Sequence, residues 1–257
     1  MIRATGPTTV AFSDPGGRRF VLNPGEVMVW SYSLDVSPAI RAQCRSWLSV
    51  DEADRARRFV SELTRQHYEV AHGGLRSILS QYTSQDPALL RFQSGPAGKP
   101  ALQEEGDSPS AEIGFNLTHS HGRCLVAVAA GRQVGIDVEL IRQDVECEKL
   151  AARFFAPAER RAVAGQERSQ QAAAFFRHWV AKEAYLKLKG VGLQFPLERC
   201  QITLSADNTM AAVDWMVKPG LVEQGTVRFL PLSEGWLGAV AAEGTGWSVR
   251  VDEWPLA

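Results

Sequence analysis

The stretch VGIDVEL, residues 134–140, places two acids in what otherwise has the pattern of a buried β-strand. Side chains alternate between the two faces of a strand, so the aliphatic residues share one face. Asp137 and Glu139 share the other face, and alternate Cα atoms lie roughly 6 to 7 Å apart. Two like charges this close repel each other and raise a pKa. The pair therefore needs either open water or a cation.

Length and composition indicate an ordinary globular protein. The chain has 257 residues, of which 45% are hydrophobic and 22% charged, enough for one large domain or two small ones. The net charge of −1 gives no overall field that would favour a nucleic-acid or membrane partner. Neither class of partner is therefore expected.

The cysteines and the apolar segments predict a cytoplasmic protein. Four cysteines are scattered without the CxxC spacing, which favours buried thiols in a reducing compartment over disulfides or a zinc site. The first twenty residues lack the apolar run of a signal peptide. The longest clean apolar run, residues 124–130, is too short to span a bilayer.

Helix and strand signals alternate along the chain. Residues 1–18, rich in Gly, Pro, Ser and Thr, predict a loose lead-in, and residues 26–36 alternate as a strand does. Ser37 and Pro38 predict a helix start, and SVDE at 49–52 is a capping box that opens a second helix. A longer helix, a hairpin near 113–131, helices near 145–155, 157–165 and 170–189, and further strands are expected to follow.

A similarity between two segments of the chain suggests that it consists of two similar halves. Residues 115–131 and 229–244 share a Phe, a turn and an apolar Ala/Val strand that ends in Gly, although any two buried hairpins look alike. We therefore predict an α/β (α+β) fold of two pseudo-twofold-related halves, 19–132 and 133–257. Each half is expected to pack a small, mostly antiparallel sheet against a long helix, with the active site at the seam. VGIDVEL would begin the second half, its apolar face toward its own core and its acids toward the seam.

A third acid lies on the long helix expected near 170–189. Phe176, Val180, Glu183 and Lys187 fall on one stripe of this helix. A Glu183–Lys187 pair on a solvated face is the alternative, worth a few tenths of a kcal/mol. The neighbouring Phe and Trp residues favour an inward face, where a charge needs a partner. A third carboxylate beside the two on the strand would complete an oxygen site for a hard cation such as Mg²⁺.

Five motifs together resemble one enzyme family. They are GKPAL (98–102), FNLTHS (115–120), GIDVE (135–139), FF-P-E (154–159) and WVAKEAYLKLKGVGL (179–193). In this order and spacing they resemble the 4′-phosphopantetheinyl transferases of the larger, surfactin-synthetase-activating (Sfp) type, over roughly residues 27–245. The resemblance implies transfer of the phosphopantetheine arm of coenzyme A to a serine of an apo acyl or peptidyl carrier protein, with release of adenosine 3′,5′-bisphosphate.

The resemblance also implies catalytic roles. Asp137, Glu139 and Glu183 would hold Mg²⁺ against the diphosphate of coenzyme A. Glu183, directly or through water, would deprotonate the carrier serine, and Lys187 would stabilise the charge on the transferred phosphate. Such a set suits attack on a diphosphate, which needs a cation and a base.

Further residues would bind the nucleotide if the resemblance holds. Thr118 and His119 would contact its phosphates, with His119 at the 3′-phosphate. Lys99 would lie near the adenine or the 3′-phosphate, and Arg55 matches a position that is basic in relatives. The chain departs from the family pattern by Thr118 in place of Ser, by an apolar residue between the two strand acids, and by His67 where some relatives carry Arg. Lys182 lies on a stripe offset from that of Glu183, so a structural or interface role is equally open.

Two other readings remain open at the level of sequence. Three carboxylates and a lysine also suit a Mg²⁺-dependent phosphohydrolase, but that reading leaves FNLTHS and GKP unexplained. A non-catalytic coenzyme A-binding protein of the same fold would be expected to have lost Glu183 or Lys187, and both are present. The resemblance also implies a monomer, because members of the larger type are usually single chains in which both halves meet.

Overall fold

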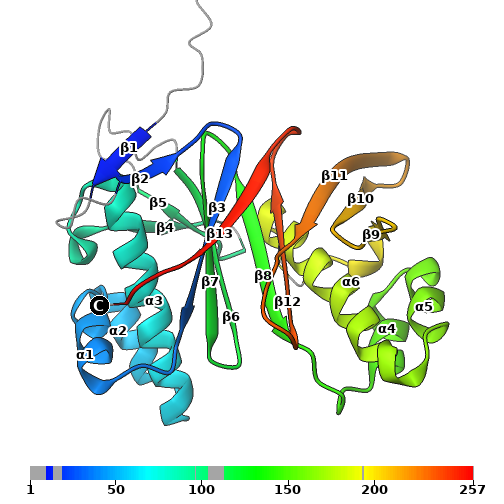
Figure 1. Cartoon of the computed structure of the whole chain (residues 1–257), viewed down its shortest axis with the longest axis horizontal. Coiled ribbons are helices and arrows are strands. Elements are labelled where there is room, and N and C mark those ends of the chain that lie inside the picture. Colours follow the sequence, from blue (N-terminus) through cyan, green and yellow to red (C-terminus); the bar gives the residue numbers. More distant parts are fainter. Residues whose placement is uncertain (1–9, 14–18, 96, 104–112, 193, 257) are drawn as a thin grey trace, which may run out of the picture.

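The computed structural model describes residues 10–13, 19–95, 97–103, 113–192 and 194–256, and Figure 1 shows their arrangement. The helices are α1 (Pro38–Ser46), α2 (Val50–Arg57), α3 (Glu62–Thr83), α4 (Cys147–Phe154), α5 (Pro157–Ala164) and α6 (Arg168–Lys189). The strands are β1 (Val10–Ser13), β2 (Arg19–Leu22), β3 (Glu26–Ser33), β4 (Phe92–Ser94), β5 (Pro100–Leu102), β6 (Ile113–Ser120), β7 (Arg123–Ala130), β8 (Val134–Leu140), β9 (Cys200–Leu204), β10 (Met210–Lys218), β11 (Leu221–Phe229), β12 (Trp236–Ala242) and β13 (Ser248–Glu253).

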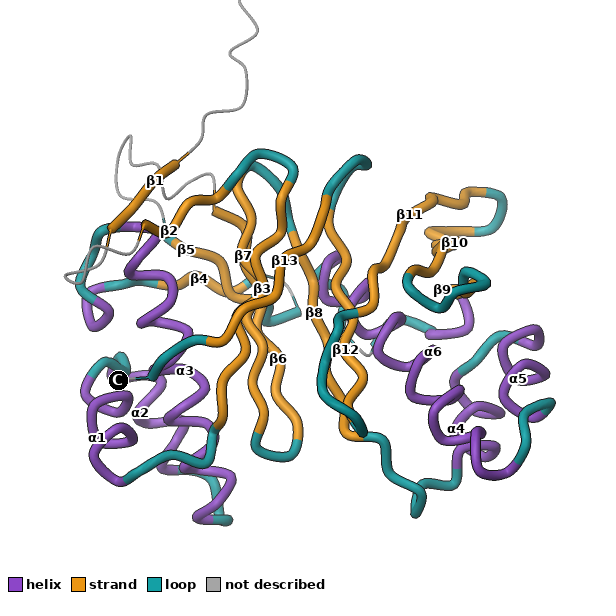
Figure 2. Tube along the Cα trace, in the orientation of Figure 1, coloured by secondary structure: helices purple, strands orange, loops and turns teal. Residues whose placement is uncertain are grey.

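Two sheets form the centre of the molecule. The first sheet has the strand order β13-β3-β7-β6, and the second has the order β8-β12-β11-β10-β9. Neighbouring strands are antiparallel except β13 and β3, which are parallel. The sheets lie next to each other, with α3 outside the first and α6 outside the second (Figures 1 and 2). The predicted mixed α/β class, with small, mostly antiparallel sheets each packed against a long helix, is confirmed.

The helix starts follow from local sequence. Ser37 accepts a hydrogen bond from the backbone N–H of Ile40, and Pro38 is the first residue of α1. Ser49 and Glu52 form the predicted capping box at the start of α2. These caps satisfy backbone N–H groups that have no partner inside the helix.

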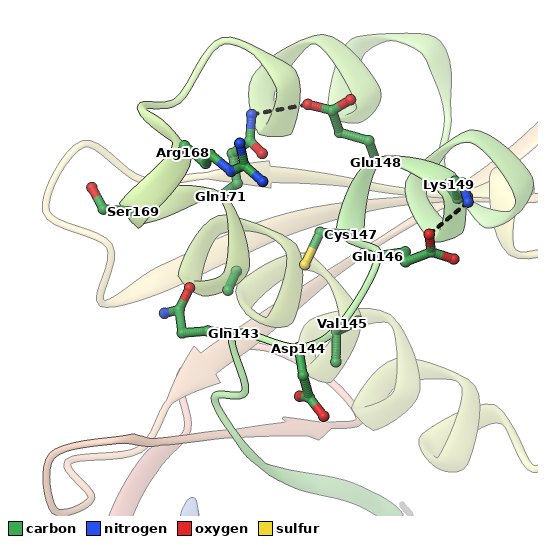
Figure 3. Close-up of a pocket in the computed structure, with 11 residues that line it drawn as sticks. Gln143, Asp144, Val145, Glu146, Cys147, Glu148, Lys149, Arg168, Ser169 and Gln171 are labelled. Carbon is green, nitrogen blue, oxygen red and sulfur yellow. Dashed lines mark hydrogen bonds and ion pairs between the residues drawn. The ribbon is translucent and has the colours of Figure 1, made fainter.

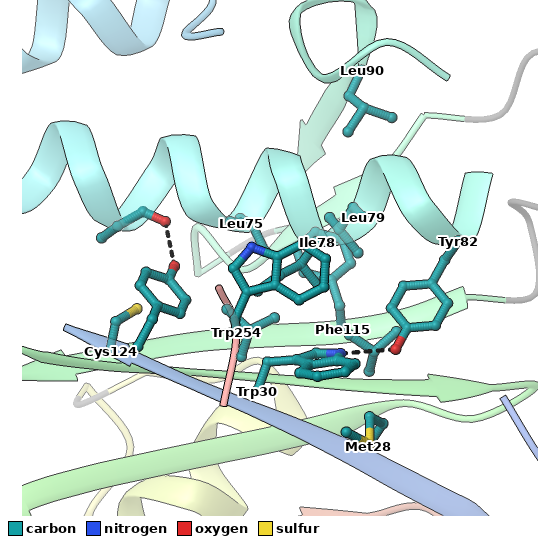
Figure 4. Close-up of a cluster of buried hydrophobic side chains, with 14 of the residues drawn as sticks. Met28, Trp30, Leu75, Ile78, Leu79, Tyr82, Leu90, Phe115, Cys124 and Trp254 are labelled. Carbon is teal, nitrogen blue, oxygen red and sulfur yellow. Dashed lines mark hydrogen bonds between the residues drawn. The ribbon is translucent and has the colours of Figure 1, made fainter. Parts of the chain in front are cut away.

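The first core lies between α3 and the first sheet (Figure 4). Trp30 donates its indole N–H to the Tyr82 hydroxyl at 2.8 Å, and the Tyr32 hydroxyl donates to the Ala71 carbonyl at 2.8 Å. Each aromatic ring is thus buried with its polar atom satisfied, as buried polar groups require. Apolar burial here fixes α3 against β3, β6 and β7.

The aliphatic face of β8 packs against the other sheet. Val134, Ile136 and Val138 share a buried cluster with Val29 and Leu125 of the first sheet. The prediction that this face turns toward the core of its own half is therefore wrong. Edge strand β8 lies between a sheet on one side and α6 on the other, so both of its faces are covered. Asp137 and Glu139 point to the α6 side and still meet the other half, through β6.

The C-terminal strand returns to the first half. β13 pairs in parallel with β3, and Trp254 lies in the first core at 5.1 Å from the Trp30 ring. A strand of the segment 133–257 therefore completes the sheet of the segment 19–132. The division of the chain at residue 133 and the pseudo-twofold relation of the halves stay predictions.

The segment expected to be a loose lead-in contains a strand. Val10–Ser13 forms β1, which pairs with β2, while residues 1–9 and 14–18 lie outside the described part of the chain. The four cysteines are buried free thiols, as their spacing predicted. Across the residues that the structure describes, no helix has the length and apolarity needed to cross a membrane.

Candidate active site at the junction of the two sheets

The edge strands β6 and β8 lie side by side and are joined by side chains. Their pairing is absent from the strand order of either sheet. Asn116 accepts the backbone N–H of Ile136 at 3.0 Å, and the Thr118 hydroxyl donates to the Asp137 carboxylate at 3.1 Å. One further step along, Ser120 donates to Glu139 at 2.7 Å. Three alternate side chains of β6 thus connect the two halves and reach both strand acids.

A glycine lets α6 approach the same strand. A Cβ atom on Gly135 would lie 2.1 Å from both the carbonyl oxygen of Ala184 and the backbone nitrogen of Leu188. No side chain fits in that space, so the direct contact between α6 and β8 requires the glycine of the GID motif at this position. The contact brings Glu183 and Lys187 of α6 to the acidic side of β8.

Lys187 connects the helix to the strand acids. Its ammonium group lies 2.6 Å from Asp137 Oδ1 and 3.1 Å from the Thr118 hydroxyl. The side chain of Lys187 is 29% exposed, whereas that of Asp137 is 7% exposed. The lysine therefore has one side on the buried carboxylate and another open to an incoming anion.

Glu183 is buried beside like charges. Burial, with Asp137 and Glu139 adding to it and Lys187 opposing it, raises the pKa of Glu183 to about 7. Burial also raises the pKa of Asp137, against the effect of Lys187 and Thr118, and the pKa of Glu139, against the hydrogen bond from Ser120. Because each acid acts on the pKa of Glu183, the three carboxylates are electrostatic neighbours.

Two carboxylate oxygens at this place lack hydrogen-bond partners among the described residues. Glu183 Oε1 and Asp137 Oδ2 are buried without a donor. Within the described residues, no three His, Cys, Asp or Glu side chains come close enough together to hold a metal ion by themselves. Two orphaned oxygens and mutual repulsion among three acids nevertheless fit a divalent cation whose remaining ligands come from a substrate.

His119 lies on the α3 side of β6. Desolvation, His72, Lys187 and His67 lower the pKa of His119, which keeps its imidazole neutral at pH 7. His119 is exposed, so a ligand can reach it. His67, the residue named above as a departure from the family pattern, lies 2.9 Å from the Asp35 carboxylate.

Arg55 belongs to an aromatic cluster that the motifs did not predict. Its guanidinium lies 5.8 Å from the centre of the Tyr68 ring, and Tyr68 stacks on His72 with ring centres 4.0 Å apart. His72 contacts Glu52 at 3.2 Å, and Glu52 accepts a hydrogen bond from the buried Arg76. The four-residue spacing of Tyr68 and His72 on α3 is the signal that indicates their shared face.

Lys99 contacts the first residue of β8, away from the strand acids. Its ammonium group donates to the carbonyl oxygens of Val134 at 2.8 Å and Leu188 at 3.3 Å, and to Gln133. Burial lowers its pKa to about 8. Lys99 and Lys189 line a pocket of about 860 Å³ at this end of α6. None of the contacts found in the described residues joins Lys99 to Arg55 or His119.

Lys182 points away from the acids. It is fully buried and contacts Glu159 at 2.8 Å, together with the carbonyl oxygens of Leu197 and Cys200. Glu159 in turn accepts the backbone N–H groups of Ala156 and Ile202. Lys182 therefore joins α6 to α5 and β9, so of the two roles left open by the sequence the structural one applies.

A separate pocket of about 790 Å³ lies between the β8–α4 connection and the start of α6 (Figure 3). Its lining includes Asp144, Glu146 and Glu148 against Lys149 and Arg168, so acids outnumber bases. None of the residues predicted for the site lines it. This pocket is therefore distinct from the carboxylate cluster.

Comparisons with known proteins cover the residues of the junction. The sequence model of the 4′-phosphopantetheinyl transferase superfamily matches residues 133–226, which include both strand acids, Glu183 and Lys187. The chain is 36% identical over 230 residues to the 4′-phosphopantetheinyl transferase HetI of Nostoc sp. (strain PCC 7120), covering 88% of this chain and 91% of that protein. It is 30% identical over 172 residues to the 4′-phosphopantetheinyl transferase Sfp of Bacillus subtilis (strain 168), covering 65% of this chain and 70% of that protein.

A more distant relative is the human L-aminoadipate-semialdehyde dehydrogenase-phosphopantetheinyl transferase, 26% identical over 204 residues, or 74% of this chain and 65% of that protein. The fold, the three carboxylates and the relatives all indicate the same class of protein, which is a transferase of phosphopantetheinyl groups. The chain belongs to the 4′-phosphopantetheinyl transferase superfamily.

Proposed function

We propose that the protein moves 4′-phosphopantetheine from coenzyme A to a serine hydroxyl of an apo acyl or peptidyl carrier protein. The observation that carries the proposal is the junction itself. Glu183 and Asp137 each keep one buried oxygen without a partner, beside the partly exposed ammonium group of Lys187. Such a cluster suits a diphosphate with its cation on one side and an attacking hydroxyl on the other.

Each residue has a chemical role in this proposal. The serine oxygen forms a bond to the phosphorus on the pantetheine side, and the bond from that phosphorus to the bridging oxygen breaks, which releases adenosine 3′,5′-bisphosphate. Glu183, directly or through water, takes the serine proton, and Lys187 stabilises the developing charge. Asp137, Glu139 and Glu183 would hold Mg²⁺, which would neutralise the diphosphate oxygens when bound.

Nucleotide binding is assigned to the N-terminal half. His119 and Arg55 are our candidates for phosphate and nucleotide contacts, with Tyr68 and His72 as the adjoining aromatic surface. The Thr118 hydroxyl donates its single proton to Asp137, so its contact with a phosphate must differ from simple donation. Lys99 would contact the nucleotide from the pocket at the end of α6.

Partners and compartment follow from the same proposal. The partners are coenzyme A and the apo carrier protein, the protein acts as a monomer, and it works in the cytoplasm. Of the other readings, a non-catalytic coenzyme A-binding protein has no need of two acids with free buried oxygens, because such groups are costly to bury. A Mg²⁺-dependent phosphohydrolase would use the same acids but would release products without a carrier adduct.

The test is a mass measurement on the carrier. The protein is incubated with coenzyme A, Mg²⁺ and a panel of apo acyl and peptidyl carriers, and each carrier is then weighed by mass spectrometry. We expect one phosphopantetheine group on the serine of at least one carrier, and none when Mg²⁺ is removed by a chelator. A folded protein that modifies no carrier in the panel would contradict the proposal, and nucleotide release without an adduct would favour the phosphohydrolase.

A further inference from the structure

The Glu139 carboxylate is held by a single protein hydrogen bond. Its Oε2 atom accepts the Ser120 hydroxyl at 2.7 Å, and the described part of the chain supplies no other hydrogen-bond donor to it. Asp137 repels this carboxylate, while the charge of Arg142 attracts it without a hydrogen bond. A long side chain under such opposing forces needs a fixed donor to stay in one orientation.

Ser120 is itself held by a tight turn. His121 and Gly122, which join β6 to β7, both have positive φ angles, 43° and 81°. The Gly122 carbonyl accepts the backbone N–H of Leu34 at 2.7 Å, which fixes the turn to the chain after β3. His121 Nδ1 lies 2.8 Å from the Ser120 oxygen. A hydroxyl has one proton, so Ser120 can donate to Glu139 while it accepts from His121.

The same arrangement of a hydroxyl on β6 and an acid on β8 occurs two residues earlier on both strands. Thr118 donates to Asp137 as Ser120 donates to Glu139, and Asn116 fixes the relative position of the two strands through the Ile136 N–H. Each strand acid therefore has its own hydroxyl donor on β6. The donors come from one half of the molecule and the acids from the other.

We propose that Ser120 is a positioning residue that holds the Glu139 carboxylate in the orientation needed to bind a divalent cation together with coenzyme A. Ser120 belongs to none of the roles assigned above. This inference rests on the proposed function, because the cation is the one that the transferase reaction requires. Residues that orient a metal ligand typically change metal affinity by 10- to 100-fold when they are removed.

The experiment compares three variants of the full-length protein. Ser120→Ala removes the hydroxyl, Ser120→Thr keeps it, and Ser248→Ala makes the same chemical change at an exposed position of β13 that is distant in sequence from the strand acids. Mn²⁺ is the probe: its free concentration is followed by electron paramagnetic resonance during titration of each protein in the presence of saturating coenzyme A. Thermal unfolding of each variant is measured without metal.

We expect Ser120→Ala to weaken Mn²⁺ binding by about 10-fold while its Tm stays within about 2 °C of the wild type. Ser120→Thr and Ser248→Ala should both bind Mn²⁺ within about 3-fold of the wild type. The transfer rate of Ser120→Ala should recover as the Mg²⁺ concentration rises, because the defect lies in cation affinity and the reacting groups are unchanged.

Three outcomes would overturn the inference. They are unchanged Mn²⁺ affinity in Ser120→Ala, a loss that Ser120→Thr shares in full, or a loss that accompanies an equally large fall in stability. The carrier-mass assay separates this result from the proposed function. If the wild type modifies a carrier and Ser120→Ala binds Mn²⁺ normally, only the positioning role fails, whereas a wild type that binds no Mn²⁺ and modifies no carrier contradicts both.

Discussion

At the scale of single residues, the site depends on which buried charges have partners. Asp137 is paired with Lys187 through one oxygen, and its other oxygen is free. Glu183 has a free oxygen and a pKa near neutrality. A group that is buried, charged and only partly satisfied costs stability, and enzymes retain such groups where they serve the reaction.

Asp137→Asn tests the role of the strand acid. The substitution preserves shape and removes one charge from a cluster of three acids, so the fold should tolerate it. We expect the rate of phosphopantetheine transfer to fall at least about 100-fold, with Tm within about 3 °C of the wild type. Transfer is measured by carrier mass over time, and unfolding by circular dichroism. Unchanged transfer would remove Asp137 from the catalytic set.

Glu52 predicts an acid-dependent loss of stability. Burial alone would raise its pKa, but hydrogen bonds from His72 and the Ser49 N–H and the charge of Arg76 outweigh burial and lower it to about 2 from 4.5. A lowered carboxyl pKa contributes stability above about pH 4.5, and this contribution disappears as the pH falls toward 2.

We therefore expect Glu52→Gln to be less stable than the wild type by roughly 3 kcal/mol at pH 7, with the difference shrinking below pH 4. Urea unfolding at pH 7, 5, 4 and 3 measures the free energy of unfolding of both proteins. A difference that is constant over this range would show that the lost contact is not linked to ionisation of Glu52.

At the scale of elements, one side of α6 contributes to the candidate active site and the other side contributes to the packing of the second half. One side presents Glu183 to the junction, and the adjacent residue, Lys182, is buried on the other side against Glu159. The helix period predicted that these neighbours lie on different stripes. It could not predict what Lys182 meets, because its partners come from α5 and from the chain around β9, which are distant in sequence.

Lys182→Met should cost about 3–5 kcal/mol, because it leaves the Glu159 charge buried without its cation. Lys149→Met is the matched control, since the Lys149–Glu146 pair is exposed on both sides and its loss should cost less than about 1 kcal/mol. Both values come from urea unfolding at pH 7. Equal costs for the two variants would mean that the buried pair adds nothing special to the packing of α6.

Local patterns predicted the helices, their caps and the acid-bearing strand, because these features depend on neighbours in sequence. The contacts of Asn116, Thr118 and Ser120 with β8 were not predicted, because no local pattern shows that this face of β6 meets the strand acids. The destination of Lys99 was equally inaccessible, since its partners are backbone carbonyls at the ends of β8 and α6. Contacts between distant segments carry no local period.

At the scale of the whole molecule, the two sheets are joined in three ways. The aliphatic face of β8 packs on the first sheet, the side chains of β6 bond to β8, and β13 crosses back to pair with β3 (Figure 1). The sequence had predicted that the aliphatic face of β8 turns toward its own half, and its packing on the first sheet is the part of this arrangement that the prediction missed. A parallel strand pair between residues 26–31 and 248–253 lies beyond any pattern within a short window.

Trp254 tests the importance of the crossing strand. Its ring centre lies 5.4 Å from that of Phe20 and 5.1 Å from that of Trp30, and its indole nitrogen has no hydrogen-bond partner in the part of the chain that the structure describes. We expect Trp254→Ala to cost about 3–5 kcal/mol of unfolding free energy, because it empties a site in the first core. Trp254→Phe should cost much less, since it keeps a ring and removes an unsatisfied N–H. A tolerated alanine would show that β13 does not hold the halves together.

The central claim, that this junction transfers phosphopantetheine to a carrier, is tested most directly by product stoichiometry. Wild-type protein and Glu183→Gln are incubated with coenzyme A, Mg²⁺ and an apo carrier that the wild type modifies, and adenosine 3′,5′-bisphosphate and holo carrier are quantified in the same samples. We predict equal molar amounts of the two products with the wild type, and a loss of at least about 100-fold in both with Glu183→Gln. Nucleotide released in excess over holo carrier, or full activity in Glu183→Gln, would contradict the account.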